Sequence, residues 1–170
     1  MVFTTHAITG AAIGLATGNP ILAFVFGFLS HFILDSIPHF DQGSFYMDKD
    51  KGPAWLGAKY EESKEKFKTG KRDWIILFFD FAVAGAIGLC LLFYVPMNCW
   101  LLLILGGLGG ILPDVFDGSP WRYKFRKLKF GKIFHKFHNF FHWPLSMKYF
   151  YFGFLIQVVI VAIGLFLMLH

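Results

Sequence analysis

Residues 28–42 read FLSHFILDSIPHFDQ and place two histidines and two aspartates at the end of an apolar run. His31 and Asp35 are four residues apart, so on a helix they share one face. The proline that follows is expected to end the helix, and His39 and Asp41 come directly around it. The stretch therefore predicts an apolar helix that delivers four potential metal ligands to one of its ends.

The composition is that of a membrane protein. Hydrophobic residues make up 56% of the 170 residues and charged residues only 16%, which is too apolar for a soluble domain of this length. No linker or low-complexity tract divides the sequence, so residues 1–170 are expected to form a single membrane-embedded domain. The first residues lack the features of a cleaved secretory signal, and the first apolar segment is expected to stay in the mature protein.

Hydropathy predicts an all-α fold, a polytopic membrane protein built as a five-helix bundle with short interfacial helices in two cytoplasmic loops. One of these loop helices is expected over residues 55–69, as a solvated or amphipathic helix with mixed Lys and Glu. Glycines in the first and fourth helices favour close helix packing. The five main helices are expected at about residues 4–18, 21–37, 74–95, 98–112 and 148–169.

The basic residues predict the topology. All 16 Lys and Arg lie between residues 49 and 72 or between residues 122 and 148, in or directly beside the loops 39–72 and 114–147. The positive-inside rule then predicts that both loops are cytoplasmic, in the plasma (inner) membrane, with the N-terminus cytoplasmic and the C-terminus outside. The net charge of +5 is explained by topology and anionic headgroups, so no nucleic-acid partner is expected.

This topology brings ionisable residues to one side of the membrane. Six of the seven histidines are expected at the cytoplasmic side, and His170 is the exception. An ionisable residue in a membrane segment is costly and usually has a functional partner. The outer half offers no such residues along a path, which disfavours a transporter. The candidate metal ligands are His6, His31, Asp35, His39, Asp114, Asp117, His138 and His142.

Mixed imidazole and carboxylate ligands suit zinc first, and also manganese or iron, with two or more ions as an option. Such ions would activate water and clamp a phosphoester. Asp41 and Asp80 are the candidate catalytic carboxylates, and Asp80 could instead be a ligand or orient a histidine. Arg122 and Lys124 are candidates for binding substrate phosphate. His135 is expected to be an interfacial side chain, and Asp114 and Asp117 could also be helix caps.

Several short segments resemble the membrane-bound metal-dependent hydrolases, which are grouped with the zinc-dependent phospholipase C superfamily. They are THAITGAAIG at the start, SHFILDSIPHFD, ILPDVFD and a late histidine pair. In the soluble phospholipase C group an H-x-x-x-D pair on a helix ligates zinc, and His31 and Asp35 match it. The H-R-G-x-T-H-S pattern of many membrane members is absent, and HKFHNFFH stands in the late loop. The resemblance implies ligand roles for His6, His31, Asp35, His39 and Asp114, with His138 or His142.

The sequence thus predicts a metal-dependent hydrolase that cleaves a phosphoester of a membrane lipid or lipid-linked substrate at the cytoplasmic face of the bilayer. The alternative is a membrane metal-binding structural or sensor protein without catalysis, and a transporter is less favoured.

Overall fold

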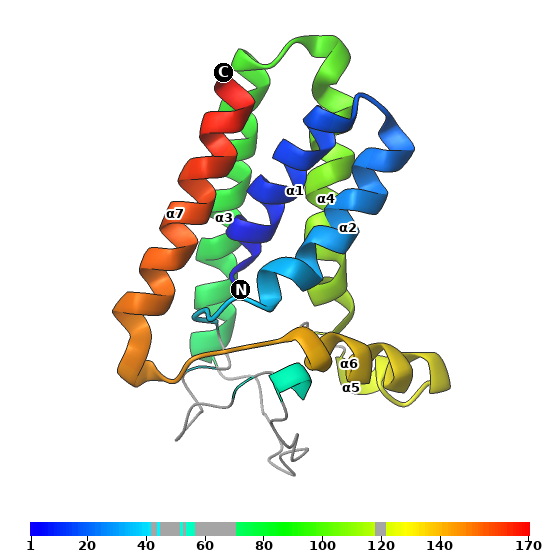
Figure 1. The fold of residues 1–170 in the computed structure, drawn as a ribbon, viewed down its shortest axis with the longest axis vertical. Coiled ribbons are helices and arrows are strands. Elements are labelled where there is room, and N and C mark those ends of the chain that lie inside the picture. The colour runs from blue at the N-terminus through cyan, green and yellow to red at the C-terminus, as the bar shows by residue number, and fades with distance from the viewer. Residues whose placement is uncertain (42–43, 45–51, 53, 57–70, 118–121) are drawn as a thin grey trace.

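The fold is seen in a computed structural model, which describes residues 1–41, 44, 52, 54–56, 71–117 and 122–170 (Figure 1). The regular elements of these residues are helices, and an isolated parallel β-bridge pairs His39 with Pro144. Most of the helix expected over 55–69 lies outside the described residues. The elements are α1 (Phe3–Thr17), α2 (Pro20–Asp35), η2 (Ala54–Leu56), α3 (Lys71–Tyr94), η3 (Met97–Cys99), α4 (Trp100–Asp117), α5 (Arg122–Phe125), α6 (Lys129–Phe141), η4 (Met147–Tyr149) and α7 (Phe150–Leu169).

The all-α prediction is confirmed, but the count of five helices is not matched. The loop after α4 folds into two further helices, α5 and α6, which lie across one end of the bundle (Figure 1). Three segments are long and apolar enough to cross a membrane, which is consistent with a membrane protein. They are Trp74–Tyr94, Met97–Asp117 and Met147–Leu169, while the apolar helix α2 is shorter.

Helix α1 lies at the centre of the bundle, in contact with α2, α3, α4 and α7. Its 15 residues rise ~22 Å, less than a bilayer core, so it spans only part of that depth. Ile8 and Ala11 of α1 pack with Leu91, Val95 and Leu103 in the hydrophobic core. The other helices therefore shield most of α1 from the surroundings.

Glycines let the backbones of α1, α2 and α4 approach closely, which the sequence predicted for α1 and α4 but not for α2. A Cβ added at Gly106 of α4 would clash with the carbonyl oxygen of Gly10 and lie 2.9 Å from the Cα of Gly14. A Cβ at Gly27 of α2 would likewise meet the backbone of Gly106. Three helices thus meet around one glycine, which fixes how their side chains are turned toward the ends of the bundle.

The sequence predicted that α4 ends before Pro113. In the structure the helix continues to Asp117 instead. A proline removes one hydrogen bond from the helix, and this cost is tolerated where neighbouring helices surround the site. Pro113 is fully buried among them. The extra turn keeps Asp114 and Asp117 on the helix, at the end of the bundle where α2 also ends.

Candidate metal centre

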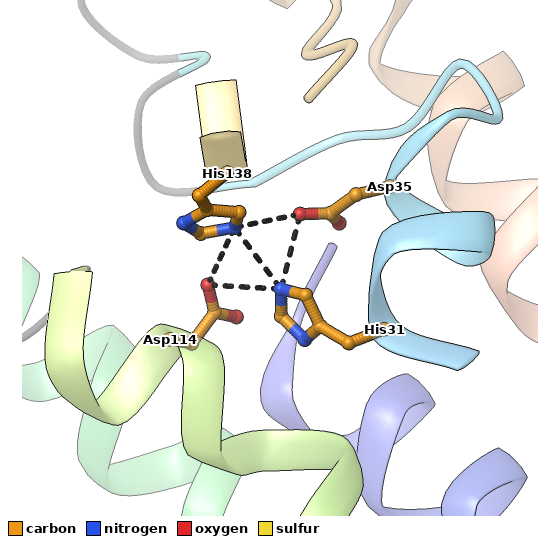
Figure 2. Close-up of side chains that lie close together, drawn as sticks. All are labelled: His31, Asp35, Asp114 and His138. Atoms are coloured by element: carbon orange, nitrogen blue, oxygen red, sulfur yellow. Dashed lines mark hydrogen bonds and ion pairs between the residues drawn. The ribbon is translucent and has the colours of Figure 1, made fainter. Parts of the chain in front are cut away.

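Four buried side chains from three helices meet at the end of the bundle that carries α6 (Figure 2). His31 and Asp35 come from α2, Asp114 from α4 and His138 from α6. One donor atom of each lies within 4.8 Å of the others. These four residues, which we call the four-residue cluster, were all predicted as metal ligands, and the structure brings them together.

The spacing of these donors suits a tetrahedral ion. The Nε2 atoms of His31 and His138 are 3.0 Å apart, and they lie 3.3 and 3.1 Å from Asp35 Oδ2. Asp114 Oδ1 is 3.7 and 3.6 Å from the same two nitrogens. Donors about 2.0–2.1 Å from one tetrahedral zinc ion are ~3.3 Å from each other. The observed separations bracket that value.

Three histidines of this region present their Nε2 atoms because their Nδ1 atoms are already bound. The Nδ1 of His31 is 2.8 Å from the carbonyl oxygen of Gly110, and that of His39 is 2.8 Å from the carbonyl of Ile37. The Nδ1 of His138 is 3.1 Å from Asp117 Oδ2. A ligating histidine almost always donates its second ring N–H to a carbonyl or carboxylate in this way. Three imidazoles are therefore oriented as metal ligands are.

His6 extends the cluster from α1. Its ring stacks on that of His31 with centroids 3.9 Å apart, and its Nε2 is 3.2 Å from Asp35 Oδ1. Asp114 Oδ2 is 3.8 Å away. The ring is fully buried, and neither of its nitrogens has a hydrogen-bond partner within the described parts of the chain. Buried polar atoms are rarely left without a hydrogen bond, so the His6 imidazole, beside two carboxylates, is a candidate ligand for an ion bound here.

Asp35, His39 and His142 form a second group that could hold a cation, and it shares Asp35 with the four-residue cluster. His39 Nε2 is 3.7 Å from Asp35 Oδ1, and His142 Nε2 is 4.0 Å from Asp35 Oδ2. The bridge between residues 39 and 144 brings these histidines together, because it pairs the segments that follow α2 and α6. Asp41 Oδ2 lies 3.0 Å from His142 Nε2, so the predicted catalytic Asp41 borders this group.

Asp117 lies behind His138 rather than in the four-residue cluster. Its Oδ2 is 2.7 Å from His135 Nδ1 and 3.1 Å from His138 Nδ1, and its Oδ1 accepts a 2.7 Å bond from Arg126 Nε. This geometry is that of a carboxylate that orients a ligand histidine. The role of Asp117 as a direct ligand stays a prediction. His135 was expected to be an interfacial side chain. In the structure it is buried and binds Asp117.

Asp80 belongs to α3, and its side chain lies beside the start of α1. Its carboxylate accepts hydrogen bonds from Phe3 N at 2.6 Å, Thr4 N at 3.0 Å and Thr4 Oγ1 at 2.6 Å. The N-cap residue of α1 is Val2, which has no side-chain oxygen, so Asp80 caps α1 from the neighbouring helix α3. These contacts favour a structural role, and a catalytic role for Asp80 stays a prediction.

The polar groups next to the cluster set its protonation. Burial lowers the pKa of His39 to about 3, with the α-ammonium of Met1 adding to the effect, so His39 is neutral. Burial acts in the same direction on His138, but hydrogen bonds to Asp117 and Asp35 outweigh it and raise the pKa of His138 to about 10. Burial opposes ionisation of Asp41, yet its contact with His142 holds the pKa of Asp41 below its usual range. The site thus combines ionised carboxylates with a demand for positive charge.

Some contacts were not anticipated from the sequence. The α-amino nitrogen of Met1 is 2.6 Å from Asp35 Oδ1, and both groups are fully buried. Gln157 of α7 accepts from Val2 N at 2.9 Å and donates to the carbonyl of Phe40 at 2.8 Å, so it ties α1 to the segment after α2. A lone glutamine in an otherwise apolar helix was the signal that could have indicated this role.

The two predicted phosphate-binding residues are not part of the described cluster. Lys124 in α5 is exposed. Arg122 is the first residue of α5, and its side chain is not among those that the structure describes. Their role stays a prediction.

Comparison of the chain with protein families, with curated proteins and with solved structures gives no match in any of the three. The function is therefore argued from the site alone.

Proposed function

We propose that the protein is a metal-dependent hydrolase that cleaves a phosphoester of a lipid or lipid-linked substrate at the cytoplasmic membrane interface. The observation that supports this most is the orientation of His31, His39 and His138. Each has its Nδ1 bound by a carbonyl or carboxylate and turns its Nε2 toward Asp35.

His31, Asp35, Asp114 and His138 would hold one ion, and Asp35, His39 and His142 a second. His6 is within reach of either through Asp35 and Asp114. Zinc is the first choice for these donors, with manganese or iron as alternatives. Such ions lower the pKa of a bound water and stabilise the charge that develops on a phosphoester.

The chain's own residues supply the remaining chemistry. Asp41 is the candidate base for a water at the second group, because its carboxylate is 14% exposed and lies 3.0 Å from His142 Nε2. His142 is 23% exposed, whereas His31, Asp35 and His39 are fully buried, so this group is the more open of the two. Arg126 and Asp117 keep His138 in position from behind.

A lipid substrate is supported by a cleft on the apolar part of the bundle. The cleft, of about 520 Å³, lies between α1 and α7 and is mostly apolar. Its first residue, Thr9, is one helical turn from His6. The lining extends from there to Leu167 and Met168 near the C-terminal end of α7, and a hydrocarbon chain suits such an apolar cleft. The residues that line the cleft are Thr9, Ala12, Ile13, Leu15, Ala16, Ile160, Ile163, Gly164, Leu167 and Met168.

The second candidate is a metal-binding structural or sensor protein. It is favoured by the four-residue cluster, which already offers four protein donors, as closed structural zinc sites do. The two candidates differ at the second group, which offers three donors and leaves a position for water or substrate. An ion there with an exchangeable water ligand favours catalysis.

The test is metal analysis of the purified protein in detergent beside its His31→Ala and Asp35→Ala variants. We expect stoichiometric zinc, manganese or iron in the wild type and less in both variants, together with release of phosphate from phosphorylated lipids by the wild type alone. His170→Ala is the matched control, because His170 lies at the opposite end of the bundle (Figure 1). Metal-free wild type, or unchanged metal content in Asp35→Ala, would contradict the proposal.

A further inference from the structure

Helix α6 has three distinct faces, and only one of them serves the metal centre. The side of α6 that packs on the bundle carries Gly131, His135 and His138, which are buried. At 100° per residue these three residues lie within one arc of about 60°. A Cβ at Gly131 would collide with the carbonyl of Phe125, so α6 is pressed tightly onto the end of α5. The rest of its surface points away from the bundle.

The second face of α6 is apolar and exposed. Phe130 is 66% exposed, Ile133 59%, Phe137 50% and Phe140 44%. At 100° per residue these four residues lie within an arc of about 80°, and the half-buried Phe134 and Phe141 separate them from the buried face. Exposing so many large apolar side chains to water is unfavourable by the hydrophobic effect, so this face is suited to an apolar partner that shields it from water.

The third face is basic. Lys129, Lys132 and Lys136 are exposed, and their spacing of three and four residues places them on one side of the helix. Helix α6 contains no acidic residue to balance them. A helix with aromatic residues on one face and lysines on the other is typical of helices that lie in the plane of a membrane surface.

The position of α6 supports the same partner. It lies across the end of the bundle where α2 and α4 end, in contact with both (Figure 1). Three segments are long and apolar enough to cross a membrane, and if they do, this end of the bundle lies at a bilayer surface. The apolar face can then enter the hydrocarbon edge while the lysines meet anionic headgroups.

We propose that α6 binds the anionic phospholipid surface through Lys129, Lys132 and Lys136, and thereby holds His138 in the metal cluster. His138 is the only contribution of α6 to the four-residue cluster among the described residues. Its helix also touches α2 and α4 there, through Phe137 against Phe32 and His138 beside Asp114. Binding of α6 to the lipid surface therefore favours the position of His138 in the four-residue cluster, which is the arrangement that binds metal. The effect on metal rests on the proposed function, whereas the lipid contact itself does not.

The lipid contact is tested by spin labels in a chain whose Cys90 and Cys99 are replaced by serine. Labels go on Ile133→Cys, on the apolar face, and on Lys136→Cys, on the basic face, in nanodiscs that contain phosphatidylglycerol. We expect the label at 133 to be accessible to oxygen and the label at 136 to a water-soluble nickel chelate. Equal exposure of both labels to water would overturn the proposal, and protection from both reagents would point to a protein partner instead.

The coupling to metal is tested by zinc titration in nanodiscs of phosphatidylcholine alone and with added phosphatidylglycerol. Each lysine near an anionic surface contributes about fivefold in binding, so three give up to about 100-fold. We expect at least about tenfold tighter zinc binding with phosphatidylglycerol, lost in the triple variant K129Q/K132Q/K136Q and kept in K129R/K132R/K136R. The Gln variant also controls for zinc that gathers at any anionic surface.

The outcomes separate the two proposals. Equal zinc affinity of the wild type in both lipids, or a Gln variant that keeps the preference, overturns the coupling. Absence of zinc binding in every sample overturns the proposed function, and the spin labels then still decide whether α6 contacts lipid.

Discussion

Asp117→Asn should weaken metal binding although Asp117 does not point into the four-residue cluster. The carboxylate is 3% exposed and contacts His138, His135 and Arg126 at 2.7–3.1 Å. Asparagine keeps the shape but loses the charge, and its amide nitrogen must face either an imidazole or the guanidinium. His138 then has at best a neutral amide oxygen in place of the carboxylate that turns its Nε2 toward Asp35.

The expected effect is a 10–100-fold loss of zinc affinity, the range seen when a carboxylate behind a ligand histidine is changed, or about 1.4–2.7 kcal/mol. The assay is competition of the purified protein with a zinc indicator. X-ray absorption on the loaded variant should show the same number of nitrogen and oxygen ligands as in the wild type.

Arg126→Gln is the matched control. The Arg126 side chain is 31% exposed and holds Asp117 from the outer side, so its loss should weaken zinc binding less than Asp117→Asn does. Zinc affinity of Asp117→Asn within twofold of the wild type would refute the reasoning. Loss of one oxygen ligand from the zinc would instead show that Asp117 is itself a ligand.

Three further outcomes are expected. Gly106→Ala should destabilise the bundle by about 1–3 kcal/mol or more in detergent unfolding, because α1 and α4 must separate, whereas Gly88→Ala, with open space around it, should not. Asp80→Asn should cost about 0.5–2 kcal/mol by weakening the cap of α1, with zinc affinity preserved; loss of turnover at unchanged stability would restore a catalytic role for Asp80. Removing metal with a chelator should lower thermal stability, by about 2.7 kcal/mol relative to zinc at 100 times its dissociation constant, and equal melting with and without chelator would count against a native metal site.

Much of the fold was accessible to prediction because hydropathy and helix-ending residues act locally. The start of α1 and the end of α2 were placed within two residues of those observed. Pro113 misled because its effect on a helix depends on what surrounds it, and neighbours that pack against α4 are not visible in a local pattern. The two helices of the last loop were underestimated for a similar reason, since α6 gains its stability from the bundle it lies on.

The candidate site was predicted as a set of residue types, and only in part as an arrangement. The spacing of His31 and Asp35 predicts that they share a helix face. In the structure His31 Nε2 lies 3.3 Å from Asp35 Oδ2. The distinct tasks of Asp80, Asp114 and Asp117 are not visible in spacing. These tasks depend on how α3 and α4 are rotated about their axes. They also depend on contact partners that are distant in the sequence, such as Thr4 for Asp80 and His138 for Asp117.

Residues 28–42 show which features follow from the sequence and which follow from the tertiary structure. The sequence by itself determined that this segment is a helix, that it carries His31 and Asp35 on one face, and that its polar end lies with the basic loops. Only the tertiary structure decided that Asp35 is shared by two groups of possible ligands and that the Nε2 atoms turn toward it. The physical reason is range: periodicity and charge are read over a few residues, whereas a ligand set needs carbonyls and carboxylates from helices that pack together.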